Sequence, residues 1–505
     1  MQNVYSFQLI KDKTIKETAT ILVPEGTSGL SLAYSLTTPL TMLVLVMLED
    51  PEGCLRFQKQ LGHSQSIISI GETSQLTTIG GIPGQINAGN WKLTVIFNHE
   101  YGKYLEDGKV IDFTIRVDFE SSAVPEAIQG PVWVDQQFNY SLLDQNKVYQ
   151  HGGKWYKGDL HTHTQLSDGK ELPQSVSDRA IADGLEFYVA TEHNLLHTGW
   201  ADTSLMVLPG IEVTTGRGHA NIFGLTKRPM TLNEIIMAHS QEEITRSIEA
   251  LLQECHENDW LFSINHPFLY LWKWLYDDIA LENLSCLEII NDPTYETDPD
   301  ADGRKANEMA VALSDLLWSQ GYRICAVGGS DSHMLQTESY PNSDLPSSPG
   351  DPATWLYMDS LTPANFKKAL KQCRSQVTRF CQVETIFHQK DMAGKDLGPL
   401  FYGDCIDDTC TNITFELLFR MDHDPLVFYI INTEKVILAT EQIHLGLYRV
   451  NGTIDLNSDE YQWIRFGATT SEGDFRFYAN PITKGHRNPE LRTFGEVRRT
   501  LEGEL

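Results

Sequence analysis

The sequence lacks any apolar segment long enough to cross a membrane. Its longest apolar run, Leu40 to Leu48 with Thr41 as its polar member, is about half the roughly 18 residues that a membrane-spanning helix needs. The chain begins MQNVYSFQLIKDK, where no apolar core follows a basic start, so no secretory signal is visible. We therefore expect no membrane partner and a cytoplasmic location.

Cysteine and basic residues are also scarce. Eight cysteines are scattered over 505 residues, which excludes a small disulfide scaffold. Cys405 and Cys410 are close enough in sequence to pair, but reduced thiols are the expected state. Lys and Arg number 39 against 68 Asp and Glu, a formal net charge of −29. Such a chain repels polyanions, so we expect no nucleic-acid duplex as a partner, whereas a bound cation still allows a small anionic substrate.

The length suggests about three domains, and the residue types and their periodicity change along the chain. Residues 1–120 carry short β-branched and aromatic runs bounded by Gly, Pro, Asn and Asp, which predict an N-terminal β-sandwich-like domain. Residues 121–153 show little periodicity and are predicted to be a linker. Residues 386–505 return to strand-like runs and predict a second small β domain. The clearest strands of the two β domains are Thr18–Val23, Leu40–Leu48, Trp91–Phe97, Val110–Phe119, Ile413–Arg420, Leu426–Ile431, Trp463–Ala468 and Phe475–Asn480.

Residues 154–385 alternate strands with helices, which predicts an α/β unit with a parallel sheet or barrel. The predicted helices are Glu171–Ala182, Leu232–Glu257, Arg304–Gln320 and Pro363–Cys373. The predicted strands are Trp155–His163, Leu185–Asn194, Met206–Thr215, His219–Leu225, Trp260–His266, Cys286–Asn291 and Ile324–His333.

Histidines and carboxylates gather at the ends of these strands. His161 and His163 alternate with Thr162, so they face the same way about 6.6 Å apart, and Asp331 and His333 repeat this spacing. One strand-end histidine is usually a polar surface residue, but six strands of one α/β unit share the pattern, and sites form at the carboxyl ends of such strands. His219 opens its strand, so it needs a short loop that folds back. The candidate metal ligands are His161, His163, Asp168, His193, Glu212, His219, His266, Asp331 and His333.

These candidates offer nitrogen and oxygen but no thiolate. That set suits Zn²⁺, Mn²⁺ or Fe²⁺. The set exceeds what one ion takes, so we expect two or three ions that share a bridging carboxylate. Such a cluster lowers the pKa of water towards about 7 and holds both oxygens of a displacement.

The motifs DLHTHT, SDG, TEHN, GIE, NHP and GGSDSH, in this order between Trp155 and Phe380, resemble the polymerase-and-histidinol-phosphatase (PHP) superfamily. The resemblance implies a distorted (β/α)7 barrel with up to three ions. The flanking segments Asp50–Gly53, Asn87–Trp91 and Asn480–Ile482 are similar to its CehA/McbA-like branch, whose members can hold fewer ions. The implied sets are His161, His163, Glu212 and Asp331 for the first ion, Glu212, His219 and His266 for the second, and Asp168, His193 and His333 for the third.

Further residues are candidates for the site. Glu192 stands where the family motif has Asp, and we expect it to support a ligand rather than bind the ion. Arg217 is a candidate to bind a substrate oxygen, with a solvated loop arginine as the alternative. Glu288 and Asn291 are expected to line the site. Trp272 and Trp274 either wall a pocket or, as we prefer, pack within the barrel's outer layer. The catalytic candidates are Glu212, Asp331, His193 and Arg217.

Two other motifs are discounted. Asp298-Pro-Asp300-Ala-Asp302-Gly303 resembles the start of a calcium loop, but the closing glutamate is displaced by one. Gly216-Arg-Gly218 precedes a strand and lacks the third glycine of a dinucleotide fingerprint. The sequence has neither a phosphate-binding P-loop nor a GxSxG elbow, so nucleoside triphosphatase and serine-hydrolase activities have no motif behind them.

The function favoured by these residues is a metal-dependent hydrolase of small-molecule esters, with a phosphoester as first choice. Hydrolysis of a carbamate, carboxylic ester or amide by a mononuclear site is the main alternative. A non-catalytic metal-binding scaffold with carbohydrate- or protein-binding β domains is the third hypothesis. Assembly into a homo-oligomer stays open.

Overall fold

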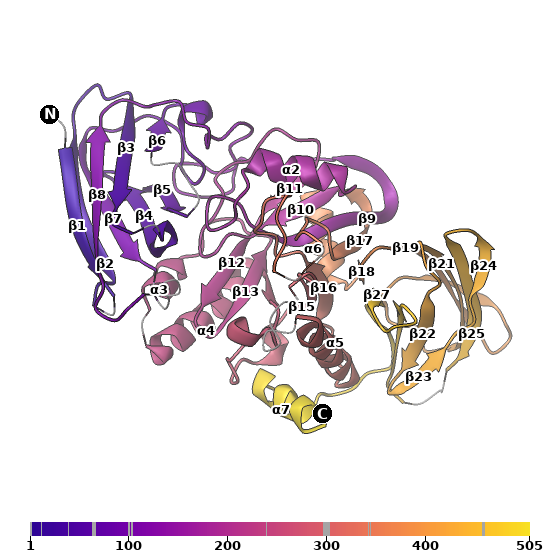
Figure 1. The fold of residues 1–505 in the computed structure, drawn as a ribbon. Helices are drawn as coiled ribbons and strands as arrows, with labels where there is room; N and C mark the ends of the chain where they lie inside the picture. Colours follow the sequence, from indigo (N-terminus) through magenta and orange to yellow (C-terminus); the bar gives the residue numbers. More distant parts are fainter. Residues whose placement is uncertain are drawn as a thin grey trace.

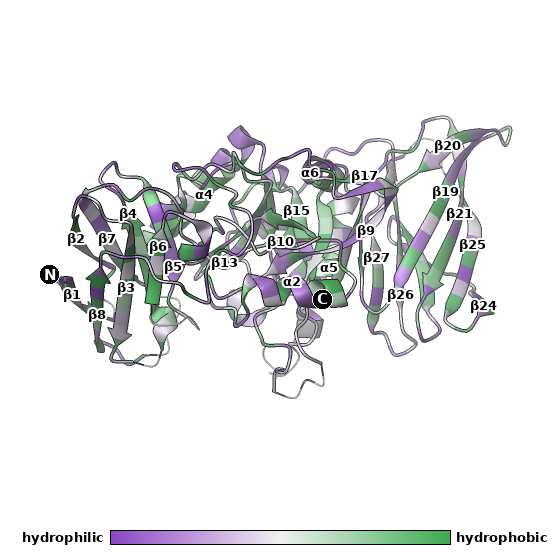
Figure 2. Cartoon of the chain, turned by 90° about the horizontal axis from the view of Figure 1, so that it is seen from above, coloured by the Kyte–Doolittle hydropathy of each residue, from purple (hydrophilic) through white to green (hydrophobic). Residues whose placement is uncertain are grey.

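The computed structural model describes residues 3–11, 13–38, 40–62, 67–98, 102, 105–238, 240–295, 303–341, 343, 345–456 and 460–504. It is a mixed α/β protein, which confirms that part of the predicted fold class. An N-terminal unit of strands, a central unit of strands and helices and a C-terminal unit of strands lie in a row (Figures 1 and 2).

Two four-stranded antiparallel sheets form the N-terminal unit. Its elements are β1 (Asn3–Ile10), β2 (Lys16–Val23), β3 (Gly29–Leu36), η1 (Thr41–Leu43), β4 (Val44–Glu49), β5 (Leu55–Gln60), β6 (Ile67–Gly71), η2 (Ser74–Leu76), β7 (Gly89–Phe97) and β8 (Val110–Asp118). The sheet orders are β1-β8-β3-β6 and β2-β7-β4-β5. Alternate residues of β8 are buried, among them Ile111, Phe113 and Ile115, as expected for a strand with one face against a core.

The central unit places its strands in two sheets. Its elements are β9 (Gln150–Thr162), α2 (Pro173–Ala182), β10 (Phe187–Ala190), β11 (Met206–Pro209), β12 (Ile211–Thr215), β13 (Gly218–Phe223), α3 (Leu232–Met237), α4 (Gln241–Asn258), β14 (Leu261–Ile264), η3 (Tyr270–Trp272), η4 (Leu281–Asn283), β15 (Cys286–Asn291), α5 (Gly303–Ser319), β16 (Cys325–Gly329), β17 (Ala353–Leu361), α6 (Pro363–Lys371) and β18 (Ser375–Thr378). One sheet has the order β12-β13-β14-β15-β16, and β13 is antiparallel to both of its neighbours. The other sheet contains β11-β10-β9-β17-β18.

The closed (β/α)7 barrel predicted from the sequence is not seen, because the hydrogen-bonded ladders of the described strands stay open. Isolated bridges, Thr162 with Ser332 and His193 with Glu212, connect the two sheets. These four residues lie at or just beyond strand ends, so the two sheets meet where the candidate ligands lie.

Two predicted elements of the central unit are divided. The predicted strand Met206–Thr215 is β11 and β12, because the chain changes sheet at Gly210, where a Cβ atom would lie 2.6 Å from Val189 Cγ1. The predicted helix Leu232–Glu257 is α3 and α4. Ser240 and Glu243 form a capping box that begins α4 afresh. The strands β17 and β18 were not predicted.

The C-terminal unit continues a sheet of the central unit. Its elements are β19 (Gln382–Asp391), β20 (Asp396–Leu400), β21 (Cys410–Arg420), β22 (Leu426–Ile431), β23 (Glu434–Ile437), β24 (Glu441–His444), β25 (Leu447–Asp455), β26 (Gln462–Thr469), β27 (Phe475–Ala479), β28 (Ile482–Lys484) and α7 (Phe494–Glu504). The ladder β18-β27-β26-β22-β23 extends the central sheet, and β20-β19-β21-β25-β24 faces it across a shared apolar core. Helix α7 returns to pack on α5.

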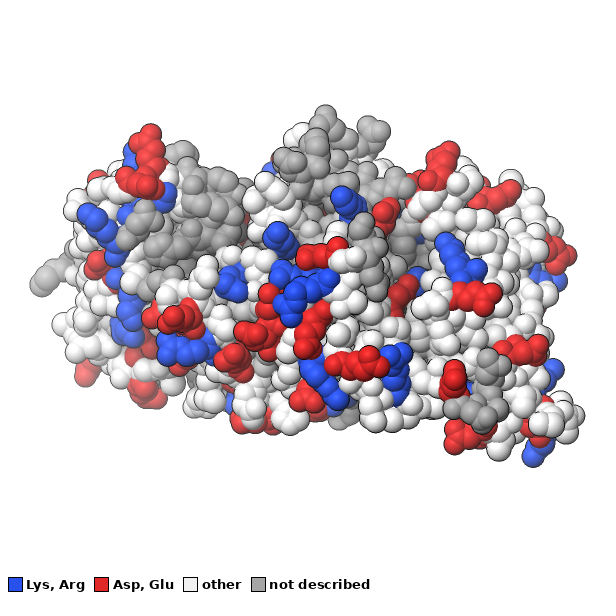
Figure 3. Space-filling view, turned by 90° about the horizontal axis from the view of Figure 1, so that it is seen from below, with Lys and Arg blue, Asp and Glu red and all other residues white. Residues whose placement is uncertain are grey.

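The surface carries both signs of charge. On the face seen in Figure 3, acidic and basic side chains are interspersed. All eight cysteines, including Cys405 and Cys410, are free. None of the helices in the described part of the chain is both long and apolar enough to cross a membrane.

Candidate metal centre

The candidate ligands come from short segments at one edge of the central unit. His161 lies on β9, and His163 directly follows it. The predicted strand Ile324–His333 is wrong in its last residues, because β16 ends at Gly329. Asp331 therefore lies in a loop, with a φ of 49°. Its backbone N–H donates to the oxygen of His161 at 2.9 Å, which holds this loop against β9.

A tight hairpin brings His219 to the same edge. β12 and β13 are antiparallel, Thr215 pairs with Gly218, and His219 is the register partner of Thr214. The start of β13 thus lies beside the end of β12, and Thr214, the partner of His219, is two residues beyond Glu212 on the same strand. This is the short, folded-back loop that the position of His219 requires.

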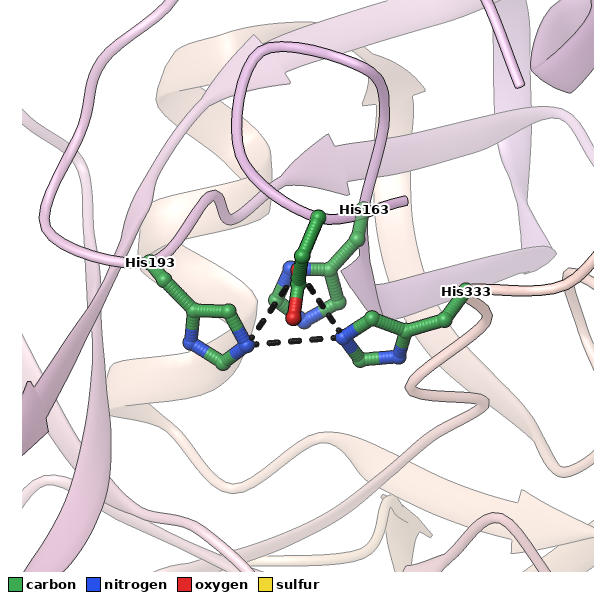
Figure 4. A group of neighbouring side chains, drawn as sticks. His163, His193 and His333 are labelled. Atoms are coloured by element: carbon green, nitrogen blue, oxygen red, sulfur yellow. Dashed lines mark hydrogen bonds and ion pairs between the residues drawn. The ribbon is translucent and has the colours of Figure 1, made fainter. Parts of the chain in front are cut away.

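Three overlapping groups of potential ligand atoms result, each with all of its atoms within 4.8 Å of one another. Each pair of groups shares one residue, which is Glu212, His163 or His193. Figure 4 shows His163, His193 and His333 pointing toward a common centre. The groups are His161, His163, Glu212 and Asp331; His193, Glu212 and His219; and His163, Asp168, His193 and His333.

Glu212 lies at the middle of this arrangement. Its Oε1 is 3.2 Å from His161 Nε2 and 3.1 Å from His219 Nδ1. His266 Nε2 also approaches Oε1, at 3.4 Å, although His266 belongs to none of the three groups. Glu212 Oε2 is 2.7 Å from His193 Nδ1. A single carboxylate therefore reaches ring nitrogens from four segments.

The third group is held around Asp168. Its Oδ1 is 3.3 Å from His333 Nε2 and 3.5 Å from His193 Nε2. His333 Nδ1 bonds to the backbone oxygen of Asp331 at 2.7 Å, which leaves Nε2 facing the group. All nine predicted ligands are thus assembled at one edge, with His266 the least integrated.

The chemistry of these atoms fits divalent metal ions. Several are buried without a hydrogen-bond partner in the described structure: His161 Nε2, His163 Nε2, Glu212 Oε2 and Asp331 Oδ1. Buried polar atoms are rarely left in that state. Imidazole nitrogens and carboxylate oxygens that converge on shared points are the ligands of Zn²⁺, Mn²⁺ and Fe²⁺.

The charges around the ligand groups also favour a bound cation. Burial disfavours the charged form of His193 and His333, but nearby carboxylates outweigh it. Asp168 and then Glu212 raise the pKa of His193 to about 9. Asp168 and then Asp331 raise the pKa of His333 to about 10. Burial and the neighbouring His333 and His193 lower the pKa of His163 to about 4. The carboxylates thus create a strongly negative site, where protons compete with a metal cation for the same nitrogens.

Carboxylates outside the groups orient the ligands. Glu288 Oε1 is 2.9 Å from His161 Nδ1, so His161 Nε2 faces the centre. Asn291 Nδ2 donates to Glu288 at 3.1 Å and to Asp331 at 3.3 Å. Such carboxylate–histidine pairs fix the tautomer and orientation of a ligand. Both residues lie at the site, as expected.

Glu192, the departure from the family motif, organises the loop that carries Asp168. Its buried carboxylate accepts hydrogen bonds from Thr164 and Ser167, through both the backbone N–H and the hydroxyl of each. It also pairs with His197 Nε2 at 2.7 Å. Although burial opposes ionisation, these bonds lower the pKa of Glu192 to about 2. His197 was not foreseen, because the pair is recognisable only once the chain is folded.

The N-terminal unit also contacts these loops, which the sequence did not reveal. Gln58 Nε2 donates to the oxygen of Leu196 at 3.0 Å, and the backbone N–H of Gln60 donates to that of Leu166 at 3.1 Å. Between them, the Lys59 ammonium bonds to the oxygen of Gln165. Strand β5 therefore supports two ligand-bearing loops.

Arg217 lies apart from the ligand groups. Its Nη2 donates to the oxygen of Leu275 at 2.5 Å and its Nη1 to Gln241 at 3.0 Å. Its guanidinium stacks over Tyr276. It does not line the cavity described next. The discounted segment Asp298–Asp302 falls outside the described residues.

A cavity of about 360 Å³ opens over the ligand groups. The groups supply its floor, and Trp272, Tyr295 and Tyr340 supply an aromatic wall. Met42 of the N-terminal unit also contributes. Trp274, in contrast, is buried against Tyr276, so of the two predicted tryptophans one faces the cavity and one packs in the core.

No protein-family model and no curated protein matches the chain. Several solved structures resemble it, including these three. A Bacteroides vulgatus protein described as containing a PHP-like metal-dependent phosphoesterase is 14% identical, with a TM-score of 0.35 and coverage of 70% of this chain and 98% of its own. A Bifidobacterium adolescentis protein described as a metal-dependent phosphoesterase is 13% identical, with a TM-score of 0.27 and coverage of 42% and 94%. A Chromobacterium violaceum amidohydrolase is 14% identical, with a TM-score of 0.23 and coverage of 37% and 91%. Since each TM-score is below 0.5, the function of this chain has to be inferred from its own site.

Proposed function

We propose that the chain is a metal-dependent hydrolase of the PHP superfamily, in its CehA/McbA-like branch, and that its substrate is a small-molecule phosphoester. The observation that carries this proposal is the convergence of buried ligand atoms in three overlapping groups, several of whose residues line one cavity. Divalent ions bound there would lower the pKa of water to about 7 and polarise the ester oxygen.

The residues of the chain hold this centre in place. Glu212 supplies a carboxylate that two groups share, Asp331 completes the group of His161 and His163, and His193 lies within reach of both Glu212 and Asp168. Glu288 and Glu192 orient the ligands from behind. Adjacent groups of this kind suit a displacement at phosphorus, in which the attacking and leaving oxygens both need a cation.

Hydrolysis of a carbamate, carboxylic ester or amide is the second candidate. It is favoured by the small number of cations at the cavity. Among the described lining residues Lys170 is the one Lys or Arg, and it is paired with Glu338 at 2.7 Å. A phosphomonoester dianion would therefore depend almost entirely on bound metal for charge neutralisation.

Comparing substrates that share one leaving group tests the proposal. The chain, loaded separately with Mn²⁺, Zn²⁺ and Fe²⁺, is assayed on 4-nitrophenyl phosphate, bis(4-nitrophenyl) phosphate and 4-nitrophenyl acetate, with Asp331→Ala as the inactive control. Metal-dependent turnover of a phosphate ester, absent in the control, is the expected result. Turnover of the acetate alone would favour the second candidate, and no turnover by the metal-loaded chain would contradict a hydrolase.

A further inference from the structure

Asp292 is a buried carboxyl group of the cavity that takes no part in the ligand groups. It follows β15 directly, lines the cavity and is 4% exposed. Its Oδ1 accepts hydrogen bonds from the backbone N–H and the hydroxyl of Thr294. The hydroxyls of Ser347 and Tyr340 lie close to the carboxyl group. Its Oδ2 is buried and, within the described structure, has no hydrogen bond of acceptable distance and angle.

The position of Asp292 joins the floor of the cavity to its aromatic wall. Its neighbour Asn291 donates to Asp331 on the floor at 3.3 Å. Tyr340 of the wall lies near enough to Asp292 for the Asp292 charge to raise the pKa of the Tyr340 phenol. Tyr340 packs edge-on against Tyr295, with ring centroids 4.9 Å apart. A substrate held over the ligand groups would therefore have its organic part beside Asp292.

Burial is unfavourable for an ionised carboxylate with an unsatisfied oxygen. Burial is the main cause that raises the pKa of Asp292 to about 7. The hydrogen bond from the Thr294 hydroxyl opposes this rise, and the charge of Asp331 adds to it. Burial and then the charges of Asp292 and Asp331 raise the pKa of Tyr340 above its ordinary value, so this neighbour stays neutral. The group thus retains a proton at pH values where an ordinary aspartate has lost it.

We propose that Asp292 is the general acid of this hydrolase and delivers the proton of its carboxyl group to the leaving oxygen of an ester whose organic group lies against Trp272, Tyr295 and Tyr340. The inference rests on the proposed function. It extends that function to esters with basic, alcohol-type leaving groups, which need a proton to depart.

The proposed step combines one displacement at phosphorus with one proton transfer. The oxygen of hydroxide forms a bond to phosphorus, and the bond from phosphorus to the leaving oxygen breaks with its electron pair on that oxygen. The proton of Asp292 moves to the same oxygen and releases an alcohol. The Asp292 carboxylate then regains a proton from water.

Replacing Asp292 by Asn isolates the proton, because the amide keeps an acceptor for Thr294. Metal-loaded wild type and Asp292→Asn are compared on two phosphodiesters, one with a 4-nitrophenol and one with a benzyl alcohol leaving group. We expect kcat/KM of Asp292→Asn to fall about 10²–10⁴-fold on the benzyl ester and less than about threefold on the nitrophenyl ester. Thr294→Val, which keeps the carboxyl and removes one of its hydrogen bonds, serves as the matched control and should lose far less turnover of the benzyl ester than Asp292→Asn.

A readout without turnover completes the test. Infrared spectra of the metal-free and metal-loaded chain at pH 6 should contain a protonated-carboxyl band that Asp292→Asn lacks, and metal content should be equal in both proteins. Wild-type turnover of the nitrophenyl ester tests the proposed function, whereas the leaving-group dependence of the variant tests the general acid, so each can fail separately. Equal losses on both esters, or no loss on either, would overturn the assignment of Asp292, as would an unchanged carboxyl band in the variant.

Discussion

The Lys59 ammonium, on strand β5 of the N-terminal unit, donates a hydrogen bond to the backbone oxygen of Gln165, in the loop that carries Asp168. The ammonium is fully buried and lies 3.6 Å from Glu126 Oε2. This buried cation bonds the N-terminal unit to the backbone of a ligand-bearing loop, although most of that unit lies far from the site. The N-terminal unit is therefore part of the metal centre's support.

Replacing Lys59 by Met tests this support. Removing one member of a buried ion pair costs about 3–5 kcal/mol, so we expect the free energy of unfolding to fall by about that amount and metal to be lost first from the Asp168 group. Urea denaturation and elemental mass spectrometry measure the two effects. Lys92→Met is the matched control, because Lys92 pairs with Glu49 on the surface of the same unit and is 57% exposed. A loss no larger than that of the control would show that the Lys59 contact supports nothing.

Glu192→Gln is expected to weaken metal binding without removing a ligand. An amide nitrogen in place of one carboxylate oxygen would face the donors Thr164, Ser167 and His197. Loss of such a supporting contact typically lowers metal affinity about 10–100-fold. Titration against a competing chelator measures the change. Unaltered affinity would mean that the loop holds Asp168 without Glu192.

His161→Ala and Asp331→Ala should each abolish turnover while the fold is kept, because His161 lies at the end of β9, Asp331 lies in the loop after β16, and the two side chains approach each other at the ligand groups. The exposed His151, also on β9, provides the control variant His151→Ala. Turnover of the metal-loaded proteins and their circular dichroism are compared. Full activity of either ligand variant, with an unchanged spectrum, would contradict the site.

Asp292 also predicts a pH dependence of stability. Its pKa is raised from 3.8 to about 7 by burial, so between these values the folded chain holds a proton that the unfolded chain has lost. The free energy of unfolding should therefore fall as the pH rises through this window, by on the order of 4 kcal/mol. Urea denaturation of metal-free protein at pH 5 and pH 8 measures the slope, and Asp292→Asn should lose this part of it. An identical slope in the variant would rule out the raised pKa.

Local pattern was enough to foresee much of the central unit. The alternation in β9 placed His161 and His163 on one side, and the predicted bounds Cys286–Asn291 of β15 are confirmed. These features depend on neighbouring residues and on the period of a strand. The clustering of strand-end ligands follows in the same way, since the carboxyl ends of parallel strands share one edge.

Features that depend on tertiary contacts could not be foreseen. The end of β16 at Gly329 follows from hydrogen bonds between the Asp331 loop and β9. Arg217 is turned away by Leu275 and Gln241, which are distant in sequence. From the sequence alone, Lys59 would be placed on the exposed face of a strand, because only the folded chain brings the loop at Gln165 over it. The separation of the two sheets likewise depends on the point between β11 and β12 at which the chain passes from one ladder to the other.

Metal content per chain tests the central claim most directly. The protein is purified without chelator, saturated separately with Mn²⁺, Zn²⁺ and Fe²⁺, exchanged into metal-free buffer and measured by elemental mass spectrometry. The overlapping ligand groups predict about two or three ions per chain, and fewer in Asp331→Ala. One ion or fewer per wild-type chain after saturation with each metal would contradict a shared cluster at Glu212.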